Sequence, residues 1–519
     1  MPLNLASPGI VVKEFDLTLG RVAPSSNKTG AIVSPFARGP VDVPTLVQNE
    51  NDLLNIFGEP YATDKHYENW LTASSFLAYG GSLRVVRAND SALVNGMIGT
   101  AASVKIDSSE HYNLLGYDEN TLANVVVAAR NPGSWSNGLR VAIIDSKADQ
   151  TLSIASTSGA VVGYGISQSV VGRVNPGAGS TAVLDGYLKG IITGIGAGTL
   201  DVKVLSHVSA GGTETTVDYQ ESGIYSFYTN QLISVLDSSV GVATTGVVTA
   251  RVDWFGQQTI GVTTNSSINW NSVAQKPGTS AYAAARGSRF DEVHVVVIDD
   301  KGKISGNSGT ILEKHLNLSK AKDAEYSTGS PSYWRKYLEV NSNYLFAGSQ
   351  PHSAIGGITT CSFNAASVGA TTLALDTNTS WDQTAAGVAF GCHGSNTLKL
   401  LGGLNYNGQT GITTTGALTA PLGNLTNGYA LFENTDNYKV DFLLMGSAAY
   451  AKETAQALAN KLISVAELRK DCLAFVSPYR AAALTDTSSQ TAVTVNSDAD
   501  ITDNVISFYS PIKIGRAHV

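Results

Sequence analysis

The sequence predicts an α/β core that is built from separated pieces of the chain and interrupted by β-rich inserts. Three observations lead to this fold class. An apolar strand, a long helix and a second strand follow one another between residues 440 and 478, and a shorter helix-to-strand pattern lies between 64 and 88. Helical periodicity then disappears between about 101 and 275, where short apolar runs alternate with Gly, Ser and Asn.

Length and composition limit the classes of protein to consider. The 519 residues suffice for roughly three to four domains of about 150 residues each. Charged residues are 15% of the chain, below the average of about 25%, and the 52 glycines favour β-rich structure with many turns. The net charge is −8 and Lys and Arg are scattered, which argues against nucleic acid as a partner. No apolar run approaches the roughly 18 residues that span a bilayer, so we expect no membrane insertion.

These patterns divide the chain into successive segments. The α/β core is expected in three parts, at residues 25–100, 286–350 and 431–513, the last part being incomplete. The β-rich inserts are expected at 101–285, as one or two subdomains, and at 351–430. Residues 1–24 are expected to form an N-terminal arm, and 514–519 a non-native tail.

The first part of the core begins with a helix and a strand. In "DKHYENWLTASSFLAYGG", apolar residues recur at helical spacing, with Asp64 placed as the N-cap and Gly80-Gly81 as the stop. "SLRVVRA", 82–88, then reads as a strand. We expect Trp70, Tyr79 and the later Trp334 to pack in a core or between domains, because this is the commoner use of aromatic residues.

The later parts of the core contain buried strands. The apolar run 292–298 predicts one strand of the second part. In the third part, strand 440–446, helix 449–470 and strand 472–478 predict a right-handed βαβ unit with parallel strands. The helix places Ala451, Ala455, Leu458 and Leu462 on one face, which suits packing on its own sheet.

The inserts read as antiparallel barrels or sandwiches. Short strands at regular spacing, separated by turn residues, are typical of both architectures. "DVKVLSHVSAGGTETTVDY" predicts a hairpin that turns at Gly211-Gly212. The glycines of "GIGAG", Gly194 to Gly198, predict turns, because no phosphate-binding loop surrounds them and no nucleotide motif occurs elsewhere.

One set of residues imitates a serine protease. "VVVIDDKG" with Asp299, "GTSAYAA" with Ser280, and His393 in "CHGS" resemble the three parts of a subtilisin-like triad. Their order along the chain is Ser, Asp, His, whereas that family has Asp, His, Ser. We therefore interpret Asp299 and Asp300 as the end of a strand that caps a turn, and Ser280 and His393 as loop residues. A subtilisin-like serine hydrolase remains the alternative from another class.

No metal or cofactor is expected. Asp299 and Asp300 could hold a cation, but adjacent side chains on a strand point to opposite faces. Cys361, Cys392 and Cys472 lie far apart and have neither zinc-site nor disulfide-framework spacing. We predict no catalytic, cofactor-binding or metal-binding residue.

Several segments together resemble a known family. They are "SPGIVVKEFD" near the N-terminus, "GAIVSPFARGPVDVPTLVQNENDLLNIFG", "ASSFLAYGGSLRVVRA", "AARNPGSWSNGLRVAI" and "FENTDNYKVDFLLMG" followed by the βαβ unit. In this order they are similar to the tail sheath proteins of contractile-tailed bacteriophages. The resemblance covers most of the core and not the inserts. It implies a core that resembles subtilisin in fold but lacks its catalytic residues.

The resemblance implies a structural function without enzymatic activity. Copies would form stacked hexameric rings around a tail tube and contract to drive the tube through the host envelope during genome ejection. The implied partners are further copies, the tail tube protein, and the baseplate and tail terminator proteins. The subunit would be made and assembled in the host cytoplasm and would end in the virion. The sheath of a related contractile injection system is an alternative.

The two ends of the chain also carry expectations. The strand pattern 7–18 begins close to the N-terminus, where a strand must find a partner. By resemblance it would be an intersubunit arm, with Ile10, Val11, Val12, Phe15 and Leu17 inserting into a neighbouring copy; the alternative is a first strand in its own domain. Family members continue beyond "NVISFYSPIK". "IGRAHV", 514–519, is what the codons ATC GGA AGA GCA CAC GTC encode, so we expect adapter readthrough and a truncated chain, or alternatively a short variant.

Overall fold

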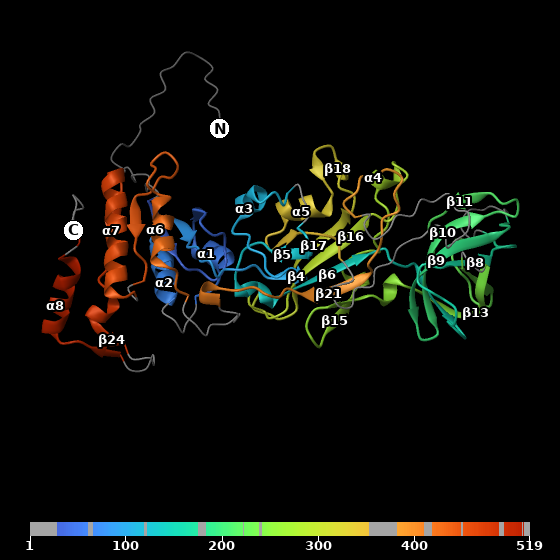
Figure 1. Ribbon diagram of the computed structural model, residues 1–519, viewed down its shortest axis with the longest axis horizontal. Coiled ribbons are helices and arrows are strands. Elements are labelled where there is room, and N and C mark those ends of the chain that lie inside the picture. The colour runs from blue at the N-terminus through green and yellow to red at the C-terminus, as the bar shows by residue number, and fades with distance from the viewer. Residues whose placement is uncertain are drawn as a thin grey trace, which may run out of the picture.

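The computed structural model describes eleven stretches of the chain, and its described part is elongated. The stretches are 28–60, 66–118, 122–174, 183–221, 223–237, 241–351, 381–408, 418–447, 450–486, 493–510 and residue 512. Figure 1 shows helices packed on a sheet at one end, antiparallel sheets in the middle, and a group of long strands at the other end. We call these parts the α/β end, the middle body and the barrel.

The α/β end is built on a mainly parallel sheet with the order β2-β3-β1-β22-β23. The strands are β1 (Thr29–Ser34), β2 (Thr45–Val47), β3 (Ser82–Arg87), β22 (Phe442–Leu444) and β23 (Leu473–Phe475). β1 is parallel to both β3 and β22, β22 is parallel to β23, and only β2 runs antiparallel. Helix α7 (Lys452–Arg469) connects β22 with β23, which confirms the predicted strand-helix-strand unit.

Helices cover both faces of this sheet because its strands are apolar on both sides. Ala31 and Val33 pack toward α7 and α6 (Leu422–Ala430), whereas Ile32 between them packs toward α1 (Glu50–Phe57) and α2 (His66–Ala78). Gly428 of α6 allows a close approach to β1, since a Cβ atom there would collide with a methyl of Val33. The result is a helix-sheet-helix sandwich.

The helices of this end agree with the sequence pattern in most details. α2 ends where expected, with Gly80 at a positive φ of 80°, while Asp64 lies outside the described residues. Trp70 is buried as predicted, but Tyr79 is 94% exposed, so its expected packing role was wrong. Tyr79 follows the last turn of α2, where the helical repeat no longer determines the direction of the side chain. On α7 three of the four predicted residues are fully buried, whereas Ala451 is the exposed N-cap.

The middle body contains two antiparallel sheets. One has the order β20-β5-β4, from Leu345–Ala347, Val125–Ala129 and Met97–Gly99, and the other has the order β17-β16-β6-β21. The second sheet is formed by β6 (Leu139–Asp145), β16 (Glu292–Asp299), β17 (Thr310–Ser319) and β21 (Ser395–Lys399). Both faces of β16 are buried, with Val295 packing on one side and Val296 on the other.

The position of β16 differs from the expectation for residues 286–350. The sequence suggested a strand of the α/β core, but β16 pairs antiparallel with β17 and with β6, which comes from the predicted insert 101–285. A strand buried on both faces has the same continuous apolar pattern in a parallel or an antiparallel sheet. The choice of partner strand therefore could not be read from the local pattern.

The third part is a closed six-stranded antiparallel barrel. Its strands are β7 (Gln150–Ile154), β8 (Gly165–Ser169), β9 (Tyr187–Gly196), β10 (Thr199–Val208), β12 (Leu232–Asp237) and β13 (Gly241–Asp253). They follow the order β10-β7-β13-β12-β8-β9, and the pairing of β9 with β10 closes the ring. Closure gives each of these six strands a partner on both sides. Its interior is filled mainly by Leu, Ile and Val with Phe227.

Glycines mark two turns of the barrel where the sequence predicted them. Gly198, with a φ of 74°, lies in the tight connection between β9 and β10. Gly212, with a φ of 83°, lies in the turn between β10 and β11 (Glu214–Thr216), an additional strand beside β10. Both positions need a backbone conformation that residues with a Cβ atom rarely adopt. The turn prediction was wrong for Gly194 and Gly196, which lie within β9 and pair with β10.

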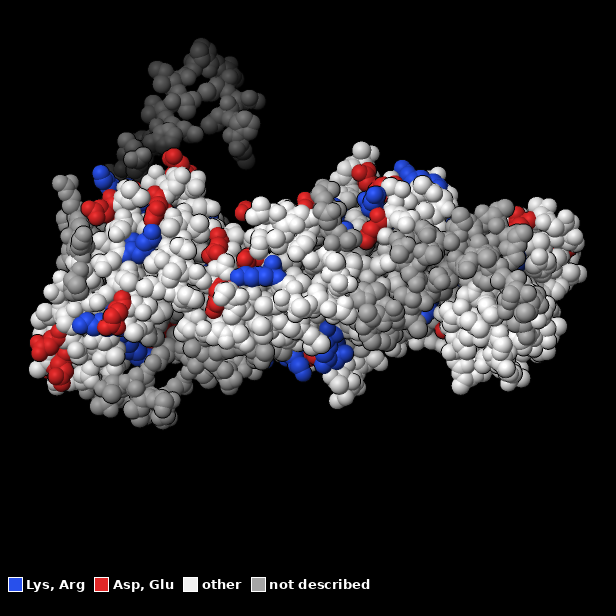
Figure 2. Space-filling model, viewed as in Figure 1, with Lys and Arg blue, Asp and Glu red and all other residues white. Residues whose placement is uncertain are grey.

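Shorter elements complete the described part. The helices are α3 (Ser109–Leu114), α4 (Ala281–Ala284), α5 (Trp334–Asn341) and α8 (Asp498–Tyr509). The strand pairs are β14 (Thr259–Gly261) with β15 (Ser267–Asn269), β18 (Glu325–Ser327) with β19 (Ser330–Pro331), and β24 (Leu484–Asp486) with β25 (Val493–Val495). None of the described helices is long and apolar enough to cross a membrane. On the face drawn in Figure 2, Lys and Arg are interspersed with Asp and Glu.

Buried Arg87 joins the α/β end to the middle body. It is the last residue of β3, and its guanidinium donates to the carbonyls of Phe36, Ala37 and Gly39 in the loop after β1. The same group donates over 2.7 Å to the carbonyl of Pro132, which follows β5 of the middle body. Its guanidinium carbon also lies 5.6 Å from the ring centroid of Tyr406.

Candidate functional site

The predicted arm residues Ile10, Val11, Val12, Phe15 and Leu17 lie outside the described residues. The structure begins at Lys28, directly before β1. The backbone N–H of Thr29 donates over 2.8 Å to the carboxylate of Asp441, and Lys28 Nζ lies 6.0 Å from the ring centroid of Phe442. The backbone N–H of Ser82 in β3 donates to the carbonyl of Lys28 on the other side. The described chain therefore begins at the central strand of the sheet, between β3 and β22.

The edge of that sheet carries exposed apolar side chains. β23 is the last strand of the described sheet, and its Leu473 and Phe475 are 45% and 54% exposed. Phe475 contacts Phe442, with ring centroids 5.6 Å apart, and Phe442 contacts Phe76 of α2 at 6.0 Å. We call these four residues the edge patch. A strand edge next to apolar surface is a template for pairing with another strand.

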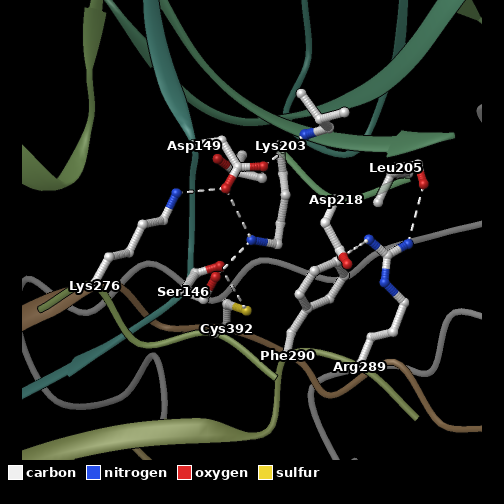
Figure 3. Close-up of polar contacts among 12 residues, drawn as sticks. Ser146, Asp149, Lys203, Leu205, Asp218, Lys276, Arg289, Phe290 and Cys392 are labelled. Atoms are coloured by element: carbon white, nitrogen blue, oxygen red, sulfur yellow. Dashed lines mark hydrogen bonds and ion pairs between the residues drawn. The ribbon is translucent and has the colours of Figure 1, made fainter. Parts of the chain in front are cut away.

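A second candidate region lies where the barrel joins the middle body, and we call it the junction network. The side chain of Lys203, a residue of β10, points away from the barrel and toward the middle body, as Figure 3 shows. Its Nζ donates to Ser146 Oγ over 2.6 Å and lies 3.4 Å from Asp149 Oδ1. The same Nζ lies 4.1 Å from the ring centroid of Phe290. A buried ammonium is thus held by a hydroxyl, a carboxylate and an aromatic face.

Asp149 is the centre of the junction network. Its Oδ1 accepts from Lys276 Nζ over 2.6 Å, and its Oδ2 accepts from the backbone N–H of Val204 over 2.8 Å. Burial opposes its ionisation, but the positive charges of Lys203 and Lys276 prevail and lower the pKa of Asp149. Burial also lowers the pKa of Lys203, and the nearby carboxylate offsets only part of that effect. The network thus ties a buried lysine of the barrel to the carboxylate of the residue directly before β7.

Arg289 makes a second link across the same junction. Its guanidinium donates to the backbone carbonyls of Leu205 and Val217 over 3.0 and 2.8 Å, and to Asp218 Oδ1 over 2.8 Å. Next to these links is a cavity of about 280 Å³, lined by Lys203, Lys276 and others. Such short polar contacts, several of them to backbone groups, fix the orientation of the barrel on the body.

On the body side a second buried ion pair lies close to the network. Lys320 Nζ is 3.0 Å from Asp145 Oδ2 and donates to the carbonyls of Phe290 and Gly391. Cys392 Sγ lies 3.4 Å from the carbonyl of Ser146, and burial raises the pKa of its thiol to about 12. A thiol with such a pKa stays protonated at neutral pH and is a poor nucleophile.

Cys392 is expected to resist alkylation in the folded protein. Iodoacetamide at pH 8 should label it at least about a hundredfold more slowly than in urea, because the thiol is both buried and protonated. Half-buried Cys472 serves as the internal control and should react faster. Peptide mass mapping over time gives both rates. Labelling of native Cys392 at the rate of a free thiol would contradict the protonated, enclosed environment.

The protease-like residues do not form a triad. Ser280 caps α4, and its Oγ donates over 2.7 Å to Asp291. Asp299 accepts the backbone N–H groups of 303, 304 and 305, as expected for a carboxylate that caps a turn. The ring centroid of His393 lies 5.4 Å from that of Trp381, and its backbone N–H donates to Asp145. The hydrogen bonds of the three residues thus lead to separate partners.

The adjacent residues Asp299 and Asp300 also bind different partners. Asp300 accepts from Arg140 over 2.6 Å and lies 3.2 Å from Lys399 Nζ, whereas Asp299 binds its own turn. In the described stretches no group of three or more His, Cys, Asp or Glu is placed to hold a metal ion. Cys392 and Cys472 are free, and Cys361 lies outside the described residues.

The chain is similar to three phage proteins. The tail sheath protein of Enterobacteria phage T4 is 42% identical over 88 residues, 17% of this chain and 13% of that protein. The one of Vibrio phage KVP40 is 41% identical over 90 residues, again 17% and 13%. The one of Salmonella phage ViI is 22% identical over 357 residues, 66% of this chain and 48% of that protein. The chain is a relative of bacteriophage tail sheath proteins.

These similarities cover only part of each protein. This tail sheath relative spans less than half the length of the curated relatives that it matches. No family profile matches it. Among solved structures, a sheath tail protein from Listeria innocua is 14% identical over 44% of this chain and 34% of that chain, with a TM-score of 0.14.

Sequence reasoning missed the junction network of this tail sheath relative. Lys203 and Arg87 each interrupt an apolar strand, in "DVKVL" and "SLRVVR", and a lone cation in such a run is a signal for a buried polar contact. Asp149 lies between two strands, in "DSKADQT", and resembles an ordinary turn residue. Its role depends on Lys276, which is more than a hundred residues away.

Proposed function

We propose that the chain is a structural subunit of a contractile phage tail sheath and has no enzymatic activity. The observation that carries the proposal is its similarity to three proteins that are all named tail sheath proteins. Copies form stacked hexameric rings around the tail tube, and contraction of the stack drives the tube through the host envelope. The subunit is assembled in the host cytoplasm, becomes part of the virion, and contacts the tube, baseplate and tail terminator proteins.

The buried contacts between the three parts of the subunit support a structural role. A helix-covered sheet, a middle body and a closed barrel are joined by buried polar links at Arg87, Asp149 and Arg289. Rigid joints of this kind let a subunit move as one body when its contacts with neighbours change. We further propose that the α/β core has a subtilisin-like arrangement, which its parallel strands β3, β1, β22 and β23 support.

We propose that the N-terminal arm links neighbouring copies by strand addition. Its inserting residues are Ile10, Val11, Val12, Phe15 and Leu17. The twelve residue-to-residue steps from Leu17 to Thr29 span up to about 40 Å when extended, which is enough to reach another copy. The edge patch supports this proposal, because it offers both an end strand and apolar side chains. A contact between different surfaces of identical chains can repeat into a helical stack.

Electron microscopy tests the function. The purified chain is expected to form rings or tubes as its concentration is raised. Deletion of residues 1–24, and separately Phe475→Lys in the edge patch, should each raise the concentration needed for polymers by about tenfold or more, since each removes part of a buried contact.

The matched control is Tyr79→Lys, which changes an aromatic residue that is 94% exposed and lies outside the edge patch. Circular dichroism verifies that each variant is folded. If the folded chain gives neither rings nor tubes over a wide range of salt and concentration, the sheath function fails. If the unchanged chain polymerises and the arm-deleted chain polymerises equally well, the arm assignment fails and the sheath function stands.

A further inference from the structure

A cleft of about 490 Å³ lies between the α/β end and the middle body. One wall comes from the loop after β1 and from α1, with Arg38 and Asn55. The opposite wall comes from the start of α3, from the loop before η1 (Ser134–Gly138) with Arg130, from η1 itself with Trp135, and from the loop before β20 with Asn343. Helices α1 and α3, which contribute to the two walls, are labelled in Figure 1. Neither the edge patch nor the junction network includes any of these residues.

The lining of the cleft is cationic. It contains two arginines and no Asp or Glu. The guanidinium of Arg38 makes one hydrogen bond within the described residues, from Nη2 to the carbonyl of Leu54 over 2.8 Å. Arg130 donates to the carbonyls of Glu339 and Ser342 and to Ser109 Oγ. In the described stretches neither arginine has a carboxylate within ion-pair distance. Burial lowers the pKa of both side chains.

The two carboxylates that act electrostatically on Arg130 are already engaged. Glu313 accepts from His315, from the hydroxyl of Ser342 and from the backbone N–H of Asn343. Glu339 forms an ion pair with Lys336 over 2.9 Å. These groups act on Arg130 only at a distance, so the positive charge at the lining is not neutralised locally.

Two buried donors at the cleft have no acceptor among the described residues. They are Nε of Arg38 and the indole Nε1 of Trp135, whose side chain belongs to a residue only 8% exposed. Four other tryptophans of the protein each donate to an acceptor, namely Trp70, Trp270, Trp334 and Trp381. A buried donor without an acceptor is costly, and such groups in native proteins usually have a reason.

We propose that this cleft is a binding site for a carboxylate group. A planar guanidinium that lacks an anionic partner is suited to a carboxylate, which accepts two parallel hydrogen bonds. The carboxylate can belong to an Asp or Glu side chain of a second copy of this chain, or to a small organic acid in solution. The first source rests on the proposed sheath function, in which copies with a net charge of −8 contact one another.

A titration with citrate tests the site without any assembly. The whole chain is labelled with 5-fluorotryptophan, and the Trp135 signal in the fluorine NMR spectrum is assigned with Trp135→Phe. Citrate, with sodium chloride adjusted to constant ionic strength, should shift this signal saturably. Arg38→Gln should weaken binding by about tenfold or more, because it removes the charged donor.

The control is Arg286→Gln. Arg286 is also an arginine without an ion pair in the described part, but its guanidinium carbon lies 3.5 Å from the ring centroid of Tyr282, outside the cleft. This variant should bind citrate like the unchanged chain, and the other tryptophan signals report that Arg38→Gln is folded. A Trp135 signal that stays unchanged up to about 50 mM citrate, or equal affinity in Arg38→Gln, would overturn the proposal.

Assembly distinguishes the two sources of the carboxylate. If a second copy supplies it, Arg38→Gln raises the concentration needed for polymers by about tenfold, and citrate inhibits polymers of the unchanged chain only. If a free acid is the ligand, citrate binding is lost in Arg38→Gln while polymers form normally. Both results support the carboxylate site. If the unchanged chain does not polymerise either, the sheath function fails, and the citrate titration still decides whether the cleft binds a carboxylate.

Discussion

Replacing Asp149 with Asn is expected to lower the free energy of unfolding by about 3–5 kcal/mol, the usual cost of removing one partner from a buried ion pair. The change leaves the ammonium of Lys203 inside the junction network without its carboxylate. It also removes the charge that Lys276 contacts over 2.6 Å. We expect the loss to be concentrated at β7 and β10, the strands next to the network. Native-state hydrogen exchange of these strands at increasing urea concentrations measures it.

The matched control for this prediction is Asp218→Asn. Asp218 pairs with Arg289 at the same junction, but its side chain is 86% exposed. Exposed ion pairs contribute about 0–1 kcal/mol, so this variant should remain close to the unchanged chain. Equal effects of the two substitutions would show that burial of the junction network does not determine its contribution.

The pH dependence of the Asp149 effect provides a second test. The folded-state pKa of Asp149 is lowered, so its contribution is fully present above the unfolded value of about 3.9. The contribution is lost as the pH falls through the lower, folded value. The difference in stability between the unchanged chain and Asp149→Asn should therefore narrow below about pH 4. A difference that stays constant from pH 6 to pH 3 would contradict the assignment of the effect to the ionised carboxylate.

Replacing Arg87 with Lys is expected to lower the free energy of unfolding by about 3 kcal/mol or more. The guanidinium donates to four backbone carbonyls in two parts of the molecule, and a lysine ammonium cannot reproduce this planar arrangement. Each buried carbonyl left without a donor costs about 1–3 kcal/mol. The loop after β1 and the turn at Pro132 should then exchange their amide hydrogens faster.

Arg84→Lys on the same strand is the control for Arg87. The Arg84 guanidinium carbon lies 4.9 Å from the ring centroid of Tyr438, an interaction that a lysine can also make. Urea denaturation followed by hydrogen exchange compares the two variants directly. We expect a change below about 1 kcal/mol for Arg84→Lys. Similar decreases in the free energy of unfolding of both variants would mean that the hydrogen bonds of Arg87 between the α/β end and the middle body add no particular stability.

Local patterns were sufficient to predict only part of the α/β end. Helix α1 was not predicted, and α6 lies within residues 351–430, which were expected to form a β-rich insert but contribute this helix to the core of the α/β end. The helix of residues 449–470 and its flanking strands were recognisable because apolar residues repeat at helical spacing between two short buried runs. The structure forms this unit as α7 between parallel β22 and β23. Glycine turns at Gly198 and Gly212 were equally local, since a positive φ is required there whatever the rest of the chain does.

The partners of the strands could not be predicted from local patterns. The run 292–298 was correctly read as a buried strand, but its pairing with β6 joins segments about 150 residues apart. Closure of the barrel depends on the pairing of β9 with β10 in addition to five further strand pairs. Strands of a barrel and of a sandwich both alternate between inward-facing and outward-facing residues. The sequence pattern therefore could not distinguish the two architectures.

The sequence by itself determined the kinds of elements in this tail sheath relative, the family that it resembles, and the unsuitable order of the protease-like residues. The tertiary structure alone decided which charges meet. Lys203, Asp149 and Lys276 come from distant segments, as do Arg38 and Arg130 at the cleft. The physical reason is that periodicity records which side of an element is buried, whereas an ion pair or a cleft depends on which buried sides are brought together.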